Sequence, residues 1–208
     1  MDPDQHHQMK AFITDRQTNR TALVGSTEQN RPIIEESFTR LLRIMEKHLT
    51  DHQFLLGDRP GRGDFGIFGQ FSQLCFWEPD SALIASSQSP RSIIWAYQVD
   101  DLSSHDVGGD QGWFTRQNLP TTFHDLLCEI GQTYAPFMVA NDRALASEEE
   151  VICSIQGAEY RQAPFPYQRK CLMWLRETFA SLLSKDQESV RQLIEGTGCE
   201  VLVADARD

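Results

Sequence analysis

The sequence predicts an all-α protein that carries one small β-hairpin, because apolar residues recur at helical spacing along most of its length. In residues 32–50 the predicted apolar face consists of Ile34, Phe38, Leu41, Leu42, Met45 and Leu49. In residues 166–184 the predicted buried stripe consists of Tyr167, Cys171, Trp174, Leu175, Thr178, Phe179 and Leu182. Residues 65–77 are apolar on almost every side, which is typical of a helix buried inside a bundle.

The stretch before this central helix, FLLGDRPGRGDF, predicts a specific helix start. Gly57 and Pro60 supply a turn, Gly61 is the expected N-cap, and Asp64 stands at the third helical position. A carboxylate at that position can accept a hydrogen bond from the backbone N–H of the N-cap residue. It also faces the positive end of the helix dipole.

Two glycines inside the same helix, Gly66 and Gly69, predict tight packing. They are three residues apart and therefore share a face of the helix. Each costs about 1 kcal/mol of helix propensity relative to alanine, and close approach of a neighbouring helix is the expected compensation. We therefore expect Gly69 not to tolerate a large side chain.

The remaining segments favour further helices. We expect a short first helix over residues 4–16, a polar linking loop over 17–31, and helices within EPDSALIASSQ, SPRSIIWAYQVDDL, 121–133 and 186–196. Pro136 is expected to break the helix that begins at residue 121, with a second segment running to about residue 148. The segments VICSI and AEYRQ flank Gln156-Gly157, which predicts a small hairpin within residues 150–163.

The composition restricts the partners that we expect. The formal net charge is −11, and an acidic surface repels phosphate backbones, so no nucleic-acid partner is predicted. Five cysteines with no CxxC spacing predict reduced, mostly buried thiols. The polar, acidic segment MDPDQHHQMK is unlike a signal peptide, and no apolar run is long enough to span a bilayer. We therefore expect a cytoplasmic protein with no membrane partner.

Several motifs resemble those of the glutathione transferase C-terminal domain. In that family an apolar pair, Gly-Asp/Glu and a short turn precede a Ser/Thr-x-x-Asp helix start. FLLGD at residues 54–58 is similar to the lead-in and Asp64 to the capping aspartate, whereas Gly61 departs from the family's hydroxyl residue. SPRSIIWAYQVDDL resembles the family's Pro-Arg-x-x-x-Trp helix.

The resemblance implies a helical core over residues 4–102. Residues 119–208 resemble, through YAPFMVAN and PYQRKCLMWLRE, the C-terminal extension of a bacterial group of glutathione transferase-like proteins. That extension is expected to pack on the core. The family's thioredoxin-like domain, which holds glutathione and activates its thiol, is expected to be absent, because the chain begins where the second domain would begin.

By this resemblance the chain supplies the hydrophobic-substrate side of a transferase and is not active alone. It is expected to hold no cofactor, with glutathione as co-substrate only when a thioredoxin-like domain is supplied. Phe12, Arg16 and Phe68 are the candidates for lining the substrate pocket, and core packing is the alternative interpretation of these positions. The expected partners are a small hydrophobic substrate and either the missing domain or a second copy in a homodimer.

The alternative function is a non-enzymatic helical binding or assembly module. An exposed apolar patch on the face where the absent domain would dock would favour a protein partner. The sequence contains no GxSxG motif and no local Cys/His signature of a catalytic nucleophile. No catalytic residue is therefore predicted.

No metal site is predicted either. His48 and His52 are four residues apart, but no third ligand stands at a suitable spacing, so both are expected to be solvated. The loop over residues 103–118 and its flank carry aspartates without the spacing of an EF-hand. These aspartates, expected to be solvated, are Asp100, Asp101, Asp106 and Asp110.

Overall fold

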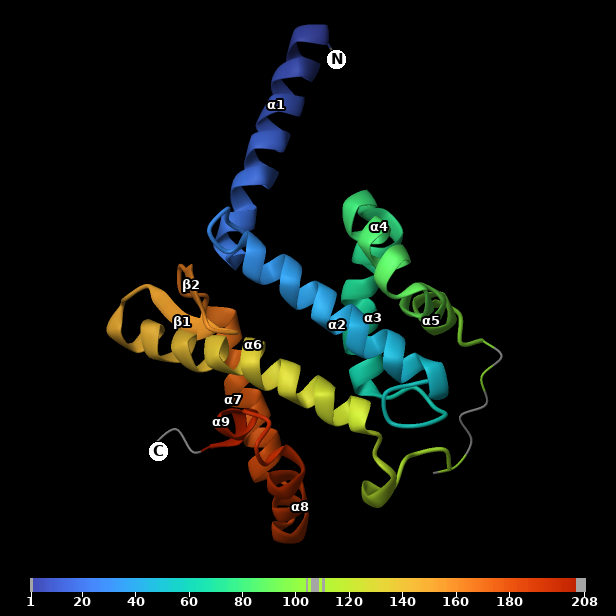
Figure 1. The fold of residues 1–208 in the computed structure, drawn as a ribbon. Helices are drawn as coiled ribbons and strands as arrows, with labels where there is room; N and C mark the ends of the chain where they lie inside the picture. Colours follow the sequence, from blue (N-terminus) through green and yellow to red (C-terminus); the bar gives the residue numbers. More distant parts are fainter. Residues whose placement is uncertain (1, 104, 106–108, 110, 205–208) are drawn as a thin grey trace. The chain divides into compact units, whose positions relative to one another are not determined.

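The computed structural model describes residues 2–103, 105, 109 and 111–204, and these are mostly helical with a single two-stranded sheet (Figure 1). The mainly helical class with one hairpin is therefore confirmed. The α-helices are α1 (Pro3–Arg20), α2 (Arg31–Asp51), α3 (Arg62–Ser72), α4 (Pro79–Gln88), α5 (Pro90–Asp100), α6 (Thr121–Ser147), α7 (Pro166–Ala180), α8 (Ser184–Ile194) and α9 (Glu200–Val203). The other elements are η1 (Thr21–Val24), the π-helical η2 (Gln73–Trp77), η3 (Arg116–Asn118), β1 (Val151–Ile155) and β2 (Ala158–Gln162).

The chain forms two compact units. One contains residues 36–129, and the other combines residues 1–35 with 130–208. The boundaries fall inside α2 and α6, whereas the sequence favoured a division into 4–102 and 119–208. Each unit has its own buried polar and apolar contacts.

The core of the 36–129 unit centres on Phe71 of α3, which is 1% exposed. Its ring lies 6.3 Å from that of Phe38 on α2 and 6.0 Å from that of Trp95 on α5, both at an interplanar angle of 87°. This edge-to-face arrangement is the one that aromatic quadrupoles favour. The consecutive elements α3, η2, α4 and α5 also pack on one another.

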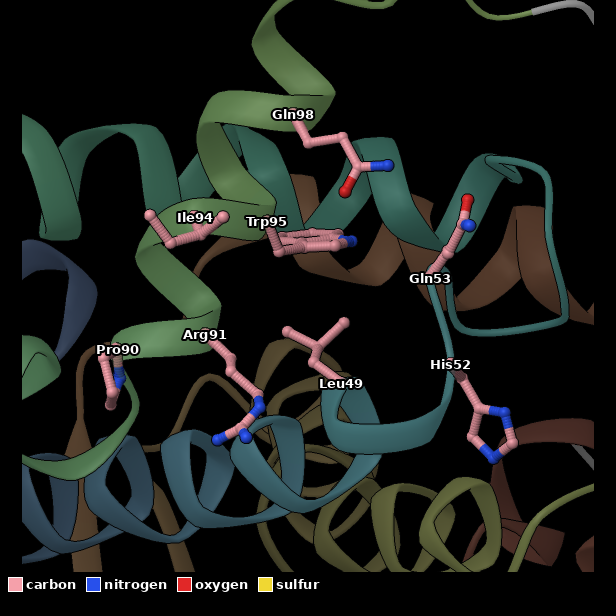
Figure 2. Close-up of a pocket in the computed structure, with 8 residues that line it drawn as sticks. All are labelled: Leu49, His52, Gln53, Pro90, Arg91, Ile94, Trp95 and Gln98. Carbon is pink, nitrogen blue, oxygen red and sulfur yellow. The ribbon is translucent and has the colours of Figure 1, made fainter.

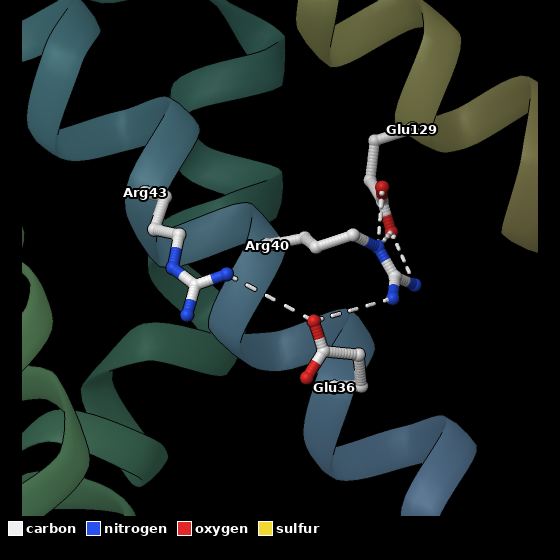
Figure 3. Close-up of polar contacts among 4 residues, drawn as sticks. All are labelled: Glu36, Arg40, Arg43 and Glu129. Atoms are coloured by element: carbon white, nitrogen blue, oxygen red, sulfur yellow. Dashed lines mark hydrogen bonds and ion pairs between the residues drawn. The ribbon is translucent and has the colours of Figure 1, made fainter.

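Charged pairs join α2 to the first part of α6 (Figure 3). Arg40 forms a bidentate ion pair with Glu129, with Nε–Oε2 at 3.0 Å and Nη2–Oε1 at 3.1 Å, and also lies 3.8 Å from Glu36. Further along α2, Lys47 lies 3.6 Å from Asp125. As residue numbers rise on α2 they fall on α6, so the paired segments are antiparallel. The geometry of the Arg40 pair gives specificity to this alignment.

In the other unit, β1 and β2 pair antiparallel, with Ile155 opposite Ala158. The two residues of the turn, Gln156 and Gly157, have φ values of 52° and 82°. Positive φ at both positions is what a tight two-residue hairpin turn requires. The predicted hairpin is therefore confirmed.

Two buried asparagines hold the second strand of this hairpin and the chain just after it. Asn30 donates to the carbonyl of Arg161 at 2.7 Å and accepts from its N–H at 3.3 Å. Asn141 donates to the carbonyl of Phe165 at 3.1 Å and accepts from its N–H at 2.7 Å. Each amide satisfies both backbone groups of one residue, so β2 and the segment that leads into α7 are fixed without a further strand.

Two predicted breaks are helical in the structure, the first of them only in part, because residues 25–30 of the predicted loop 17–31 are not helical. α1 continues through residues 17–20, where Asn19 donates to Asp15 one turn earlier at 3.0 Å. α6 runs without interruption through Pro136. A proline removes one helical donor, but Ala135, Phe137 and Met138 beside it are all buried and hold both sides of the helix in one core.

The predicted buried stripe of α7 is wrong for most of its residues. Trp174 is 48% exposed and Tyr167 57% exposed, and their rings pack on each other at the surface, 6.1 Å apart. Phe179 is the buried member of the predicted stripe, and the helix also buries Leu172, which the prediction left out. Apolar residues surround much of α7, so periodicity alone did not select the buried face.

The predicted packing of the glycine face on α3 is also wrong. A Cβ built at Gly66 or Gly69 would meet no atom within 4 Å. Both positions are exposed, and Phe65 beside them is 50% exposed. The close approach occurs elsewhere, at Gly131 of α6, where a Cβ would lie 2.0 Å from the carbonyl oxygen of Thr197.

We expect Gly69→Ala and Gly131→Ala to change stability in opposite directions. Gly69→Ala should raise the free energy of unfolding by up to about 1 kcal/mol, because alanine is the better helix former. Gly131→Ala should lower it by about 1–3 kcal/mol, because backbone must move. Urea denaturation of the two variants measures both changes. Equal effects would contradict the packing described for these positions.

Candidate functional site

The side chain of Asp64 holds the turn before α3, and this residue is 1% exposed. Its Oδ2 accepts a hydrogen bond from the N–H of Gly61 at 2.8 Å, which is the helix-start contact that the sequence predicts. Its Oδ1 accepts a second bond from the N–H of Leu55 at 3.0 Å, which the sequence analysis missed. One carboxylate therefore caps α3 and ties down the lead-in.

Gly57 occupies a position that no other residue could take without rearrangement. Its φ is 136°, and a Cβ would lie 2.0 Å from the carbonyl oxygen of Gly112. On either side of it, Asp58 donates its N–H to Gly112 and Phe114 donates to the carbonyl of Leu56, both at 2.8 Å. The turn therefore pairs with the segment around residues 112–114.

His48 is buried, so the expectation that it is solvated is wrong. It is 2% exposed, with Nδ1 at 2.7 Å from the hydroxyl of Thr122 and Nε2 at 3.0 Å from the carbonyl of Phe54. A carbonyl can only accept, so Nε2 carries the proton and Nδ1 accepts from the Thr122 hydroxyl. His48 stands three residues after Met45, on the apolar face predicted for residues 32–50. This position was a signal for burial, but it did not by itself distinguish a buried histidine from a solvated one.

His48 and Asp64 bind the two ends of one peptide unit. The carbonyl belongs to Phe54 and the N–H to Leu55, so the imidazole and the carboxylate hold the same peptide bond from its two sides. Burial lowers the pKa of His48, and burial raises the pKa of Asp64 against the opposing effect of its backbone N–H donors. The arrangement is suited to holding structure rather than to proton transfer with a substrate.

A cavity of about 300 Å³ lies between the end of α2 and α5 (Figure 2). It is lined by Leu49, His52, Gln53, Pro90, Arg91, Ile94, Trp95 and Gln98. Trp95 is 2% exposed, and its Nε1 is buried without a hydrogen-bond partner in the described part of the chain. Sequence analysis did not identify this cavity, because its two walls are about 40 residues apart along the chain.

The substrate-pocket candidates lie in separate compact units. Phe12 and Arg16 are exposed on α1, where Phe12 is 62% exposed. Phe68 is half-buried on α3. The capping residues Gly57, Gly61 and Asp64 come together as described above, and the role of the pocket candidates stays a prediction.

The described residues contain no cluster of three or more His, Cys, Asp or Glu side chains that could hold a metal ion. Of the four aspartates considered as ligands, Asp106 and Asp110 lie outside the described residues. All five cysteines are free thiols. Burial raises the pKa of Cys75 to about 11, which makes its thiolate scarce at neutral pH.

Comparison with protein-family models, with curated proteins and with solved structures finds no match for this chain. Among the helices that the structure describes, none combines the length and the apolar character needed to cross a membrane. The candidate site therefore rests on the geometry of the residues themselves.

Asp64→Ala should lower the free energy of unfolding by about 1–2 kcal/mol, because two backbone N–H groups lose their acceptor. Asp58→Ala, at an exposed residue of the same loop, is the matched control. Urea denaturation measures both variants. Equal midpoints for Asp64→Ala and the unmodified protein would show that the carboxylate contributes nothing to the turn.

His48 should make stability depend on pH. Its folded pKa lies below the usual 6.5, so the unfolded chain takes up a proton first as the pH falls. The free energy of unfolding should therefore decrease as the pH drops below about 6.5, until the folded pKa is passed.

The test is urea denaturation between pH 7.5 and 5.5. His48→Gln should be less stable at pH 7.5 yet lose less stability on acidification than the unmodified protein. His7→Gln, at an exposed position of α1, is the control for removing a histidine. An unchanged pH dependence in His48→Gln would contradict the assignment.

Proposed function

We propose that this chain is the helical, substrate-binding half of a glutathione transferase-like protein. In this proposal it works with a thioredoxin-like domain, which binds glutathione and activates its thiol. The reaction is attack of the glutathione thiolate on an electrophile, and this chain supplies the apolar side of the electrophile's pocket. The chain alone is not active.

The helix start at Asp64 carries the proposal. The lead-in FLLGD and the capping aspartate are the motif on which the resemblance to the family rests, and Asp64 bonds to both Gly61 and Leu55. Gly57 adds a left-handed turn that admits Gly112 at close range. The matched residues therefore have a common structural task, which a chance resemblance does not require.

The surface of α1 supports the need for a partner. The helix has no buried residue, and Met9, Phe12 and Ile13 are 50%, 62% and 49% exposed. These positions follow the i, i+3, i+4 spacing of one helix face. Apolar faces of this kind mark interaction surfaces, and in the proposal the thioredoxin-like domain covers this one.

The same exposed face favours the second candidate, a non-enzymatic binding or assembly module. In that case α1 docks on a protein that neither binds glutathione nor completes an active site. The two candidates differ in what accompanies this chain in its native source. That difference can be measured directly.

The test is the intact mass of the native protein, isolated with an antibody raised against this chain, followed by sequencing of its N-terminal peptides. The proposal expects a mass well above 23.7 kDa and thioredoxin-like peptides before Met1. A native protein of 23.7 kDa that begins at Met1 would favour the binding module.

Isothermal titration of glutathione into the purified chain tests the division of labour. No heat of binding is expected, because the glutathione-binding half is supplied by the other domain. Micromolar binding by the chain alone would show that it has its own glutathione site, and the proposed division would be wrong.

A further inference from the structure

We propose that the cavity between α2 and α5 binds a small uncharged apolar molecule whose carbonyl oxygen accepts a hydrogen bond from the Trp95 indole. This site is separate from the proposed pairing with a glutathione-binding domain and does not depend on it. The cavity of about 300 Å³ falls at the lower end of the range for small-molecule sites.

The buried indole N–H is the observation that points to a ligand. Trp95 is 2% exposed, and its ring packs edge-to-face on Phe71, so the indole has little freedom to turn its donor elsewhere. The Nε1 atom has no acceptor in the described part of the chain. A buried donor without a partner carries a desolvation cost that an acceptor in the cavity would remove.

The lining explains which molecule would fit. Leu49, Ile94 and Pro90 offer apolar contacts, and Figure 2 shows the indole nitrogen directed toward the side where Gln53 and Gln98 lie. A flat or branched apolar body would occupy the space between α2 and α5. Its carbonyl group would lie toward Trp95, with the two side-chain amides at the cavity rim.

The charges of the lining favour an uncharged molecule over a carboxylate. Arg91 is the cavity's residue of fixed positive charge, and it already forms an ion pair with Glu46. Glu46 also accepts from the N–H of Arg91 and from the hydroxyl of Ser89, both at 3.1 Å, so this pair is anchored at the start of α5. With Arg91 paired and a net charge of −11, little remains to offset the desolvation of an anion.

Benzamide is the probe, and the indole N–H signals in a ¹H–¹⁵N correlation spectrum of the full chain are the readout. The chain contains four tryptophans, and Trp95→Phe assigns the resonance of Trp95. Benzamide should move this resonance downfield in a saturable way, while the resonance of Trp174, on α7, stays in place. Benzoate should bind about fivefold more weakly or worse, and toluene should cause no downfield shift.

Leu49→Phe is designed to fill the cavity and should abolish the benzamide shift. Leu83→Phe, at a residue on α4 that is 70% exposed, is the matched control and should retain it. The dispersion of the spectrum shows whether each variant is folded. The proposal is overturned if benzamide at 10 mM leaves Trp95 unmoved, if the shift survives in folded Leu49→Phe, or if benzoate binds as tightly as benzamide.

Discussion

The peptide unit between Phe54 and Leu55 has to be buried without losing its hydrogen bonds, and much of the 36–129 unit is arranged around that requirement. Phe54 is 0% and Leu55 5% exposed, so water cannot serve their backbone groups. His48 binds the carbonyl and Asp64 binds the N–H. His48 lies in the last turn of α2, and Asp64 lies in the first turn of α3. The hydrogen bonds to one peptide unit therefore fix the path of the chain between the two helices.

The other unit holds half-buried backbone groups with side-chain amides. Asn30 and Asn141, both 0% exposed, each satisfy the N–H and the carbonyl of one residue, Arg161 and Phe165 respectively. An amide has both a donor and an acceptor, so a single side chain replaces a strand partner. In the 36–129 unit the donor and the acceptor come from two different side chains, His48 and Asp64. Because His48 titrates with a lowered pKa, the stability of this contact depends on pH.

Two apolar surfaces, the exposed face of α1 and the cavity beside Trp95, are available for binding. α1 buries no residue and presents Phe12 and its neighbours, which the proposed transferase function assigns to a partner domain. The cavity beside Trp95 differs in character, because it combines apolar walls with one buried donor. A chain that binds through both surfaces would use one for a protein and the other for a small molecule.

The sequence by itself determined what depends on neighbours within one or two turns. The helices with clear periodicity, the Asp64–Gly61 contact three residues apart, and the hairpin closed at Gln156-Gly157 are of this kind. Tertiary structure alone decided which face of α7 is buried, that Gly69 is open while Gly131 is tightly packed, and that His48 faces inward. Those outcomes depend on atoms distant along the chain, such as Thr122 for His48 and Thr197 for Gly131, and periodicity carries no information about which distant segment arrives.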